Sequence, residues 1–293
     1  MKILLTGVGG FIGTYLYNSL LKNGYDILGL SRSKAFIHKN SSDELIYSDL
    51  SEGLDYDEDV DVIVHAAAKS PDKGVDIEDY ISDNILATRN LVRYAKNHCL
   101  SKFIYLSSIS IYGDINTKFV DEWTSIVDPD MYGMTKFISE KLVFSLKDDI
   151  SVFSLRLPGV LGAKSKRNWL SKVAKKLLKN KDVVIYNPEA DFNNMILVSD
   201  LSVFINYLIR KQFVESTVFT LSCKSSLKIR EVVHLLKELL DSNSKIIIKK
   251  KKKNPFTISN RKAIEFGFKP LSAEDTLRSY SKDIQKGMKD YEK

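Results

Sequence analysis

The chain has 293 residues, which is enough for one large domain or two modest ones. Its hydrophobic fraction of 44% and charged fraction of 28% are those of an ordinary globular protein and exclude a disordered or fibrous chain. No apolar run reaches the length of a membrane span, and the opening "MKILLTGVGGF" is too short and too interrupted by glycine for a signal peptide. We therefore expect no membrane partner.

Cysteine and histidine usage points to the cytoplasm and away from metal. The two cysteines, Cys99 and Cys223, are far apart and lack the spacing of metal ligands. This pattern favours a reducing, cytoplasmic location without disulfides. The four histidines are scattered, so the sequence predicts no metal site.

The net charge of +7 has two interpretations. A basic surface attracts nucleic acid, and the lysine run 249–253 fits that idea. However, the run follows "KIII" and precedes "NPF", as expected for the solvated end of a short strand, and no aromatic residues interleave with the lysines. We expect no nucleic-acid partner and interpret the positive field as serving an anionic small molecule.

The first half of the chain alternates short apolar runs with helical patterns. Strands buried on both faces are predicted, in chain order, at "KILLTG", "YDILGL", "VDVIVHAAA", "KFIYLSS" and "SVFSLRLP". This alternation predicts a doubly wound parallel sheet covered by helices on both sides, an α/β fold.

The second half is less regular and predicts a smaller α/β part. Its expected strands are "DVVIY", "NMILV", "TVFTLS" and "KIIIK", and its expected helices are "REVVHLLKELL" and "AEDTLRSYSKDIQKGMK". A change in composition near Pro158 and Gly159 places the domain boundary there. We predict a dinucleotide-binding domain over 1–158 and a substrate-binding domain over 159–293, with a segment near 192–214 returning to the first.

A glycine-rich turn follows the first predicted strand. "TGVGGFIG" places Gly7, Gly10 and Gly13 three residues apart, directly before a helix. The first glycine permits a tight turn, the second lets the backbone approach a pyrophosphate, and the third lets the helix pack close to the strand. In this strand–turn–helix context the motif predicts a dinucleotide site rather than an ordinary turn.

Two further stretches carry groups suited to proton transfer. Tyr132 and Lys136, in "YGMTK", share one face of a helix, where the ammonium can favour the phenolate and make Tyr132 an acid/base for an alcohol–ketone interconversion. Ser107, Ser108 and Ser110 follow the strand "FIYL" at the sheet edge where ligands usually bind. Taken alone, the first motif could be a helix surface pair and the second a run of turn-forming serines.

Together these elements resemble the extended short-chain dehydrogenase/reductase family of nucleotide-sugar epimerases, dehydratases and reductases. "TGVGGFIG" is similar to the family's TGxxGxxG turn, "NILATRNLVRYAK" to its N-x-x-G/A-T-x-N-L helix, and "LSSISIYG" to its S-S-x-x-V-Y-G strand end. "YGMTK" matches Y-G-x-S-K, and "FTISNRKAIEFGFKP" resembles the closing motif. The resemblance covers nearly the whole chain and implies a Rossmann-type fold with a nicotinamide coenzyme.

The resemblance also implies roles for individual residues. Ser108 would hydrogen-bond the reacting oxygen, Tyr132 would be the acid/base, and Lys136 would bind the nicotinamide ribose; Ser110 would contact the substrate. Asp49 resembles the aspartate that contacts adenine, although it is equally explained as a helix cap. The other implied cofactor contacts, besides the three glycines, are Phe11, Ile12, Leu50, Ala66, Ala67, Ala68 and Asn84.

Cofactor preference depends on the end of the second strand, where NAD-binding members carry an aspartate. This chain has Ser31 there, followed by Arg32. A small serine leaves room for a 2′-phosphate, which Arg32 could bind with a charge-assisted fork. We therefore predict a preference for NADP(H), with NAD(H) as the alternative if Arg32 instead stacks on adenine.

The substrate is predicted to be a nucleotide-linked sugar. In "GVLGAKSKRNWLSK", Arg167 and Asn168 would meet the substrate diphosphate at a helix start; a solvated basic helix is the other interpretation. Gly159 and Asn193 stand where epimerases often have asparagine and a phosphate-binding arginine, which puts in doubt how the diphosphate is held.

Three hypotheses about function follow from these features. The main one is an NADPH-dependent reductase of a nucleotide-linked 4-keto-6-deoxy sugar, because an NADP preference suggests net reduction. The alternatives are a nucleotide-sugar 4-epimerase and a non-catalytic NADP-binding regulatory protein. By analogy with the family, the helices around 84–98 and 132–147 would form the interface of a homodimer.

Overall fold

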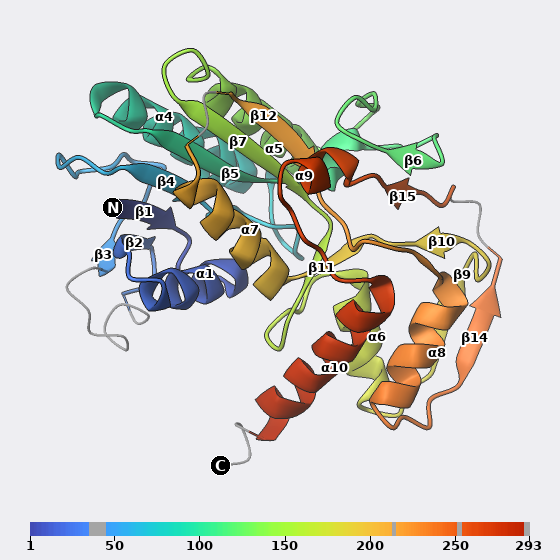
Figure 1. Cartoon of the computed structure of the whole chain (residues 1–293). Helices are drawn as coiled ribbons and strands as arrows, with labels where there is room; N and C mark the ends of the chain where they lie inside the picture. The colour runs from blue at the N-terminus through green and yellow to red at the C-terminus, as the bar shows by residue number, and fades with distance from the viewer. Residues whose placement is uncertain (35–44, 213–214, 251–253, 290–293) are drawn as a thin grey trace. The chain divides into compact units, whose positions relative to one another are not determined.

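Two compact units make up the computed structural model, which describes residues 1–34, 45–212, 215–250 and 254–289 (Figure 1). The first unit is built from Met1–Asp114, Ser125–Arg156 and Ile205–Phe219. The second is built from Ile115–Thr124, Leu157–Phe204 and Thr220–Lys293. The domain boundary predicted after residue 158 stays a prediction.

A seven-stranded sheet forms the centre of the first unit, in the order β12-β7-β5-β4-β1-β2-β3. Its strands are β1 (Lys2–Thr6), β2 (Asp26–Ser31), β3 (Leu45–Tyr47), β4 (Val62–His65), β5 (Lys102–Ser108), β7 (Ser151–Leu157) and β12 (Thr217–Thr220). The pairings β3–β2, β2–β1, β1–β4 and β4–β5 are all parallel. The predicted doubly wound sheet is therefore confirmed, and the strand order reverses between β1 and β4, where ligands bind in such sheets.

The central strands are buried on both faces, as their apolar sequences predict. Every residue of β4, β5 and β7 is buried. The helical segments of this unit are α1 (Phe11–Lys22), α3 (Ile77–Tyr80), the π-helical η1 (Ile81–Leu86), α4 (Ala87–Asn97), the 3₁₀ turn η2 (Ile109–Tyr112) and α5 (Met131–Phe144). A core of leucine, valine and aromatic side chains joins α4 and α5 to the sheet.

The second unit has its own core beneath short strands. Its strands are β6 (Phe119–Val120), β8 (Gly159–Leu161), β9 (Val183–Tyr186), β10 (Asp191–Phe192), β11 (Met195–Leu197), β13 (Leu227–Lys228), β14 (Ile246–Lys249) and β15 (Thr257–Ile258). Its helices are α6 (Trp169–Leu177), α8 (Ile229–Leu239), α9 (Arg261–Glu265) and α10 (Ala273–Lys289), and α7 (Val198–Arg210) passes from this unit into the first. The amphipathic helices α6, α8 and α10 bury their apolar faces in one cluster.

All eleven elements quoted from the sequence are helices or strands as predicted. One of them has a different place from the one expected. The strand in "TVFTLS", expected in the smaller part, is β12 at the edge of the large sheet, because α7 carries the chain back to the first unit. β14 ends at Lys249, and the rest of the lysine run from 251 to 253 lies outside the described residues.

Candidate functional site

The glycine turn after β1 has the geometry that only glycine permits. Gly7 has φ of 71°, and a Cβ there would lie 2.8 Å from the Cα of Ala67. A Cβ on Gly13 would lie 2.0 Å from the carbonyl oxygen of Gly7, so α1 starts against the turn. Gly10 is the N-cap of α1 and makes no side-chain cap, so the first amides of the helix remain for a ligand phosphate.

A cavity of about 290 Å³ opens beside this turn, entirely within the first unit. It lies at the reversal of strand order, between the loops that follow β1 and β4. Its lining residues come from the ends of four parallel strands and the loops after them, from the π-helical segment and from the first residue of α4: Gly7, Gly9, Gly10, Leu30, Ser31, Arg32, Ser33, Ser48, Asp49, Leu50, Ser51, Ala66, Ala67, Ala68, Asp83 and Ala87. The glycine cradle and this cavity fit the adenosine diphosphate part of a dinucleotide.

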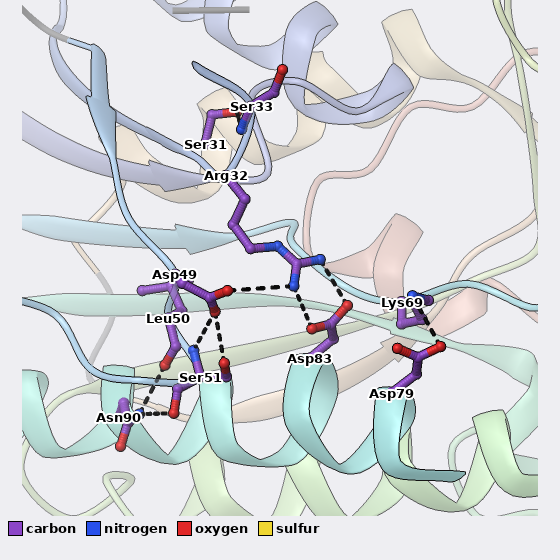
Figure 2. A network of polar contacts seen from close by, with 10 residues as sticks. All are labelled: Ser31, Arg32, Ser33, Asp49, Leu50, Ser51, Lys69, Asp79, Asp83 and Asn90. Carbon is purple, nitrogen blue, oxygen red and sulfur yellow. Dashed lines mark hydrogen bonds and ion pairs between the residues drawn. The ribbon is translucent and has the colours of Figure 1, made fainter. Parts of the chain in front are cut away.

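The guanidinium of Arg32 is held by carboxylates (Figure 2). Its Nη1 and Nη2 donate to the two oxygens of Asp83 at 2.6 and 2.7 Å, and Nη1 lies 3.8 Å from an oxygen of Asp49. The hydrogen bonds to Asp83 raise the pKa of Arg32, against the effect of burial. Position 31 lacks a carboxylate, but Asp83, 51 residues further along the chain, supplies one to Arg32, which counts against a guanidinium left open for a 2′-phosphate.

Asp49 is also engaged by its own loop. Its Oδ1 accepts hydrogen bonds from the backbone N–H and the hydroxyl of Ser51, at 3.0 and 2.7 Å. Burial alone would raise the pKa of Asp49, but these bonds and the charge of Arg32 outweigh it and lower the pKa. The next residue, Leu50, is fixed by its carbonyl, which accepts from Asn90 at 2.8 Å.

A chain of hydrogen bonds holds the loop after β4. The hydroxyl of Thr88 donates to the carbonyl of Asn84, so it accepts from Nε2 of His65, and Thr6 donates to the other ring nitrogen, Nδ1. Thr6 in turn accepts from the amides of Ala66 and Ala67. Burial, with a smaller effect of Lys136, lowers the pKa of His65 to about 3. His65 is thus a neutral structural residue behind the cavity wall.

Asn84 joins three parts of the first unit. Its side-chain oxygen accepts from the amide of Lys69, and its amide group donates to the carbonyl of Lys69 and to the hydroxyl of Thr135 on α5. Its carbonyl accepts from Ser139, one turn further along α5. Asn84 was predicted to contact the cofactor; what the structure shows is that it ties α5 to the loop after β4.

Ser108 ends β5 and begins the 3₁₀ turn η2. Its hydroxyl accepts from the amide of Ser110 at 3.1 Å, so this oxygen caps the turn. The predicted position at the carboxyl end of a central strand is thus observed. Its catalytic role, like that of the other predicted site residues, stays a prediction.

Helix α5 carries Tyr132 and Lys136 and starts against the turn that Ser108 begins. Asp130 caps α5 by accepting from the amide of Gly133 at 2.8 Å. A Cβ on Gly133 would lie 2.2 Å from the carbonyl oxygen of Ser110, so only glycine permits this approach. The close contact brings the first turn of α5, with Tyr132, beside the end of β5.

Lys136 is buried rather than exposed on the helix surface. Its Nζ lies 4.1 Å from the ring centroid of Tyr105 on β5, a cation–π contact. Burial lowers the pKa of Lys136 to about 7, although the nearby Glu140 opposes the shift. A small change in its surroundings is therefore enough to change the charge on Lys136 near neutral pH.

One turn beyond Lys136, a buried ion pair that the sequence analysis missed holds α5 to the sheet. Glu140 accepts from Arg156 of β7 at 2.6 and 3.2 Å and from Ser154 at 2.7 Å, and Arg156 also donates to the hydroxyl of Tyr112 at 2.7 Å. Both charged side chains are less than a tenth exposed. The i, i+4 step from Lys136 to Glu140 was a signal that could have been noticed, but no local pattern indicates Arg156.

Asn168, one of the two predicted substrate residues of the second unit, lines a separate, smaller cavity of about 170 Å³. Asn168 caps α6 by accepting from the amide of Ser171 and donates to the carbonyl of Val160. Gly159 and Asn168 line the cavity together with Leu161, Trp169, Leu170, Phe192 and Asn194. Arg167 directly precedes the cap.

Asn193 has a structural position. It is buried, donates to Ser222 and Ile258, and accepts from the amide of Ile258. Its neighbour Asn194 has a buried side-chain oxygen without a hydrogen-bond partner. Asn193 therefore makes structural hydrogen bonds at the position where epimerases often carry an arginine.

Within 1–34, 45–212, 215–250 and 254–289, no three or more His, Cys, Asp or Glu side chains are grouped as metal ligands. Over the same residues, no helix combines the length and the apolar character that crossing a bilayer requires.

The reversal of strand order, the glycine turn and the cavity beside it define a nucleotide-binding protein of the Rossmann type. The chain belongs to the NAD dependent epimerase/dehydratase family, whose sequence model matches residues 3–219. This confirms the resemblance to the extended short-chain dehydrogenases/reductases and supports a nicotinamide coenzyme. A preference for NADP(H), a homodimer and a cytoplasmic location stay predictions.

Relatives and solved structures agree with this assignment. The chain is 27% identical over 267 residues to the uncharacterized UDP-glucose epimerase YtcB of Bacillus subtilis, covering 82% of each chain. It is 31% identical over 185 residues to the UDP-glucose 4-epimerase of Vibrio cholerae, covering 58% of this chain and 55% of the other.

Among solved structures, the UDP-glucuronic acid 4-epimerase of Bacillus cereus, in complex with UDP-glucuronic acid and NAD, superposes with a TM-score of 0.79. The alignment has 24% identity and covers 98% of this chain and 99% of that one. At this identity the likeness shows the fold alone.

Proposed function

We propose that the chain is a nucleotide-sugar 4-epimerase that keeps its nicotinamide coenzyme through the reaction. The observation that carries this proposal is the pairing of Arg32 with Asp83. One argument for a reductase was an NADP preference inferred from Ser31 and Arg32, and the pairing of Arg32 with Asp83 counts against that inference. The epimerase alternative needs no such preference and agrees with the relatives named as epimerases.

The residues at the end of β5 and on α5 suit this reaction. When bound, the coenzyme supplies a reversible hydride acceptor. Tyr132 takes the proton of the sugar 4-hydroxyl and later returns it, and Ser108 hydrogen-bonds the same oxygen. Lys136, when charged, favours the phenolate form of Tyr132. The buried pair of Glu140 and Arg156 keeps α5 in place while the proton moves.

Turnover without added coenzyme tests the proposal. Purified protein is incubated with UDP-glucose, UDP-galactose, UDP-N-acetylglucosamine or UDP-glucuronate, and the anomeric proton signals are followed by NMR. We expect at least one substrate to convert to its C4 epimer. Tyr132→Phe should lower turnover at least about a hundredfold.

Tyr80→Phe is the matched control, because the Tyr80 ring lies 6.2 Å from that of Tyr132 and the change also removes one hydroxyl. Its turnover should stay near that of the native protein. If no substrate epimerises and a nucleotide-linked 4-keto-6-deoxy sugar instead consumes NADPH or NADH stoichiometrically, the reductase hypothesis is correct and this proposal is wrong. Unchanged epimerisation by Tyr132→Phe would remove Tyr132 from the mechanism.

A further inference from the structure

The charges around the end of β2 do not suit the ribose 2′-phosphate that distinguishes NADP(H) from NAD(H). Among the described residues that line the cavity, Arg32 is the one cation, while Asp83 and Asp49 are both acids. Counting formal charges, one positive and two negative groups leave this corner at about −1. A ribose 2′-phosphate adds a further −1.5 to −2 or so at pH 7, so like charges would meet there.

The hydrogen bonds of Arg32 also argue against a 2′-phosphate at this position. Its two terminal nitrogens are engaged by one carboxylate in a bidentate fork, the arrangement in which an arginine would otherwise grip a phosphate. Asp83 is 7% exposed at its side chain and sits on the π-helical segment η1, whereas Arg32 is 51% exposed. The fixed partner is therefore the acid, and Arg32 reaches to it from the end of β2 (Figure 2).

We propose that Asp83 determines coenzyme specificity: by occupying the Arg32 fork it excludes a 2′-phosphate and selects NAD(H) over NADP(H). The role of the missing acid at position 31 is thus taken by a residue from a different segment. This inference deepens the proposed function and rests on its coenzyme site.

The neighbouring described lysines do not line the cavity, and both contact other side chains. The Nζ of Lys34 lies over the ring of Tyr47, 5.0 Å from its centroid. The Nζ of Lys69 pairs with Asp79 at 3.2 Å, one turn before Asp83, as Figure 2 shows. The hydroxyl of Ser31 accepts from the amide of Ser33, so it is part of the turn rather than a substitute for a charged ligand.

Binding of the two coenzymes tests the proposal without any turnover. The full-length protein, stripped of bound coenzyme, is titrated with NAD⁺ and NADP⁺ by calorimetry. We expect the native protein to bind NAD⁺ at least about tenfold more tightly. In Asp83→Asn the freed Arg32 should tighten NADP⁺ binding about tenfold to a hundredfold, the range for a hydrogen bond to a charged group. Adding Arg32→Ala to this variant should cancel the gain.

Asp79→Asn is the matched control, because Asp79 is an acid of the same helical stretch but pairs with Lys69 and not with Arg32. The ratio of its dissociation constants for NAD⁺ and NADP⁺ should equal that of the native protein. Should Asp83→Asn fail to fold, Asp49→Asn should show a smaller gain for NADP⁺, because its oxygen is 3.8 Å from Arg32. Equal or tighter native binding of NADP⁺, or an unchanged ratio in the folded variant, would overturn the inference while leaving epimerisation untouched. Failure to bind either coenzyme would overturn the proposed function as well.

Discussion

Two bidentate arginine–carboxylate pairs lie in the first unit, and they differ in what surrounds them. Arg156 and Glu140 meet at 2.6 Å with 7% and 3% of their side chains exposed. Arg32 and Asp83 also meet at 2.6 Å, but Arg32 is 51% exposed at the edge of a cavity.

The comparison shows that environment, not bond length, decides what an ion pair does. In the buried fork, either charge left alone would be costly, so the pair cannot exchange partners and serves to fix α5. In the open fork, Arg32 is half exposed, so water or a ligand can take the place of its carboxylate partner at small cost, and the pair can discriminate between ligands. Of the variants described next, Glu140→Ala and Asp83→Asn test this difference directly.

The largest expected effect comes from breaking the buried fork. Glu140→Ala leaves the Arg156 charge without its partner in the interior, which should lower the free energy of unfolding by about 3–5 kcal/mol in urea titrations. Glu274→Ala, which breaks the exposed i, i+4 pair with Arg278, is the control and should leave the transition unchanged. A loss as small as the control's would mean that the buried pair does not hold α5.

The second effect concerns the close approach at the start of α5. Gly133→Ala would place a methyl group 2.2 Å from the carbonyl oxygen of Ser110, and the helix must shift to relieve it. We expect a loss of about 1–3 kcal/mol in thermal or urea unfolding. Met134→Ala, at an exposed position of the same helix, should cost less. Native stability in the Gly133→Ala variant would show that this contact is loose.

The third effect is a dependence of stability on pH. His65 has a pKa of about 3 in the folded chain and 6.5 when it is exposed to solvent in the unfolded chain, so between these values the unfolded chain binds more protons. Stability from this residue is complete above pH 6.5 and declines as the pH falls towards 3, by about 2 kcal/mol between pH 6.5 and 4.5. Urea titrations across this range should show a shallower decline for His65→Gln, and parallel curves would contradict the assignment.

The smallest expected effect comes from the open fork. Without coenzyme, Asp83→Asn should change the free energy of unfolding by less than about 1 kcal/mol, because water solvates the exposed guanidinium. The same urea titrations measure it. A loss comparable to that of Glu140→Ala would show that the two forks are alike and that exposure is a poor guide to their roles.

Short-range patterns in the sequence predicted most of the fold. Runs such as "KFIYLSS" have the length, apolar character and flanking residues of buried strands, and the glycines at 7, 10 and 13 require the turn that is observed. The start of α5 is equally local, because it contains Asp130, Gly133 and the pair Tyr132 and Lys136 within a few residues of one another. The structure confirms the α/β sheet, whereas the roles of the site residues stay predictions.

The parts that were not predicted depend on contacts between distant segments. Arg32 was correctly noticed, but its partner Asp83 comes from a helical segment 51 residues away, and nothing near position 32 indicates it. Arg156 looks like an ordinary residue of the strand "SVFSLRLP" until β7 is placed beside α5. The return of β12 to the large sheet likewise follows from the path of α7, not from the strand's own residues.

The π-helical segment Ile81–Leu86 makes this region sensitive to its length. Its wider turn holds one residue more than an α-helical turn, and its neighbours Asp83 and Asn84 reach different partners, Arg32 and Thr135. Deleting one residue would remove the wide turn, and Asp83 and Asn84, which lie within it, could not both keep the directions in which they reach Arg32 and Thr135. Natural variants of this segment should therefore tolerate changes of side chain more readily than a change of a single residue in length.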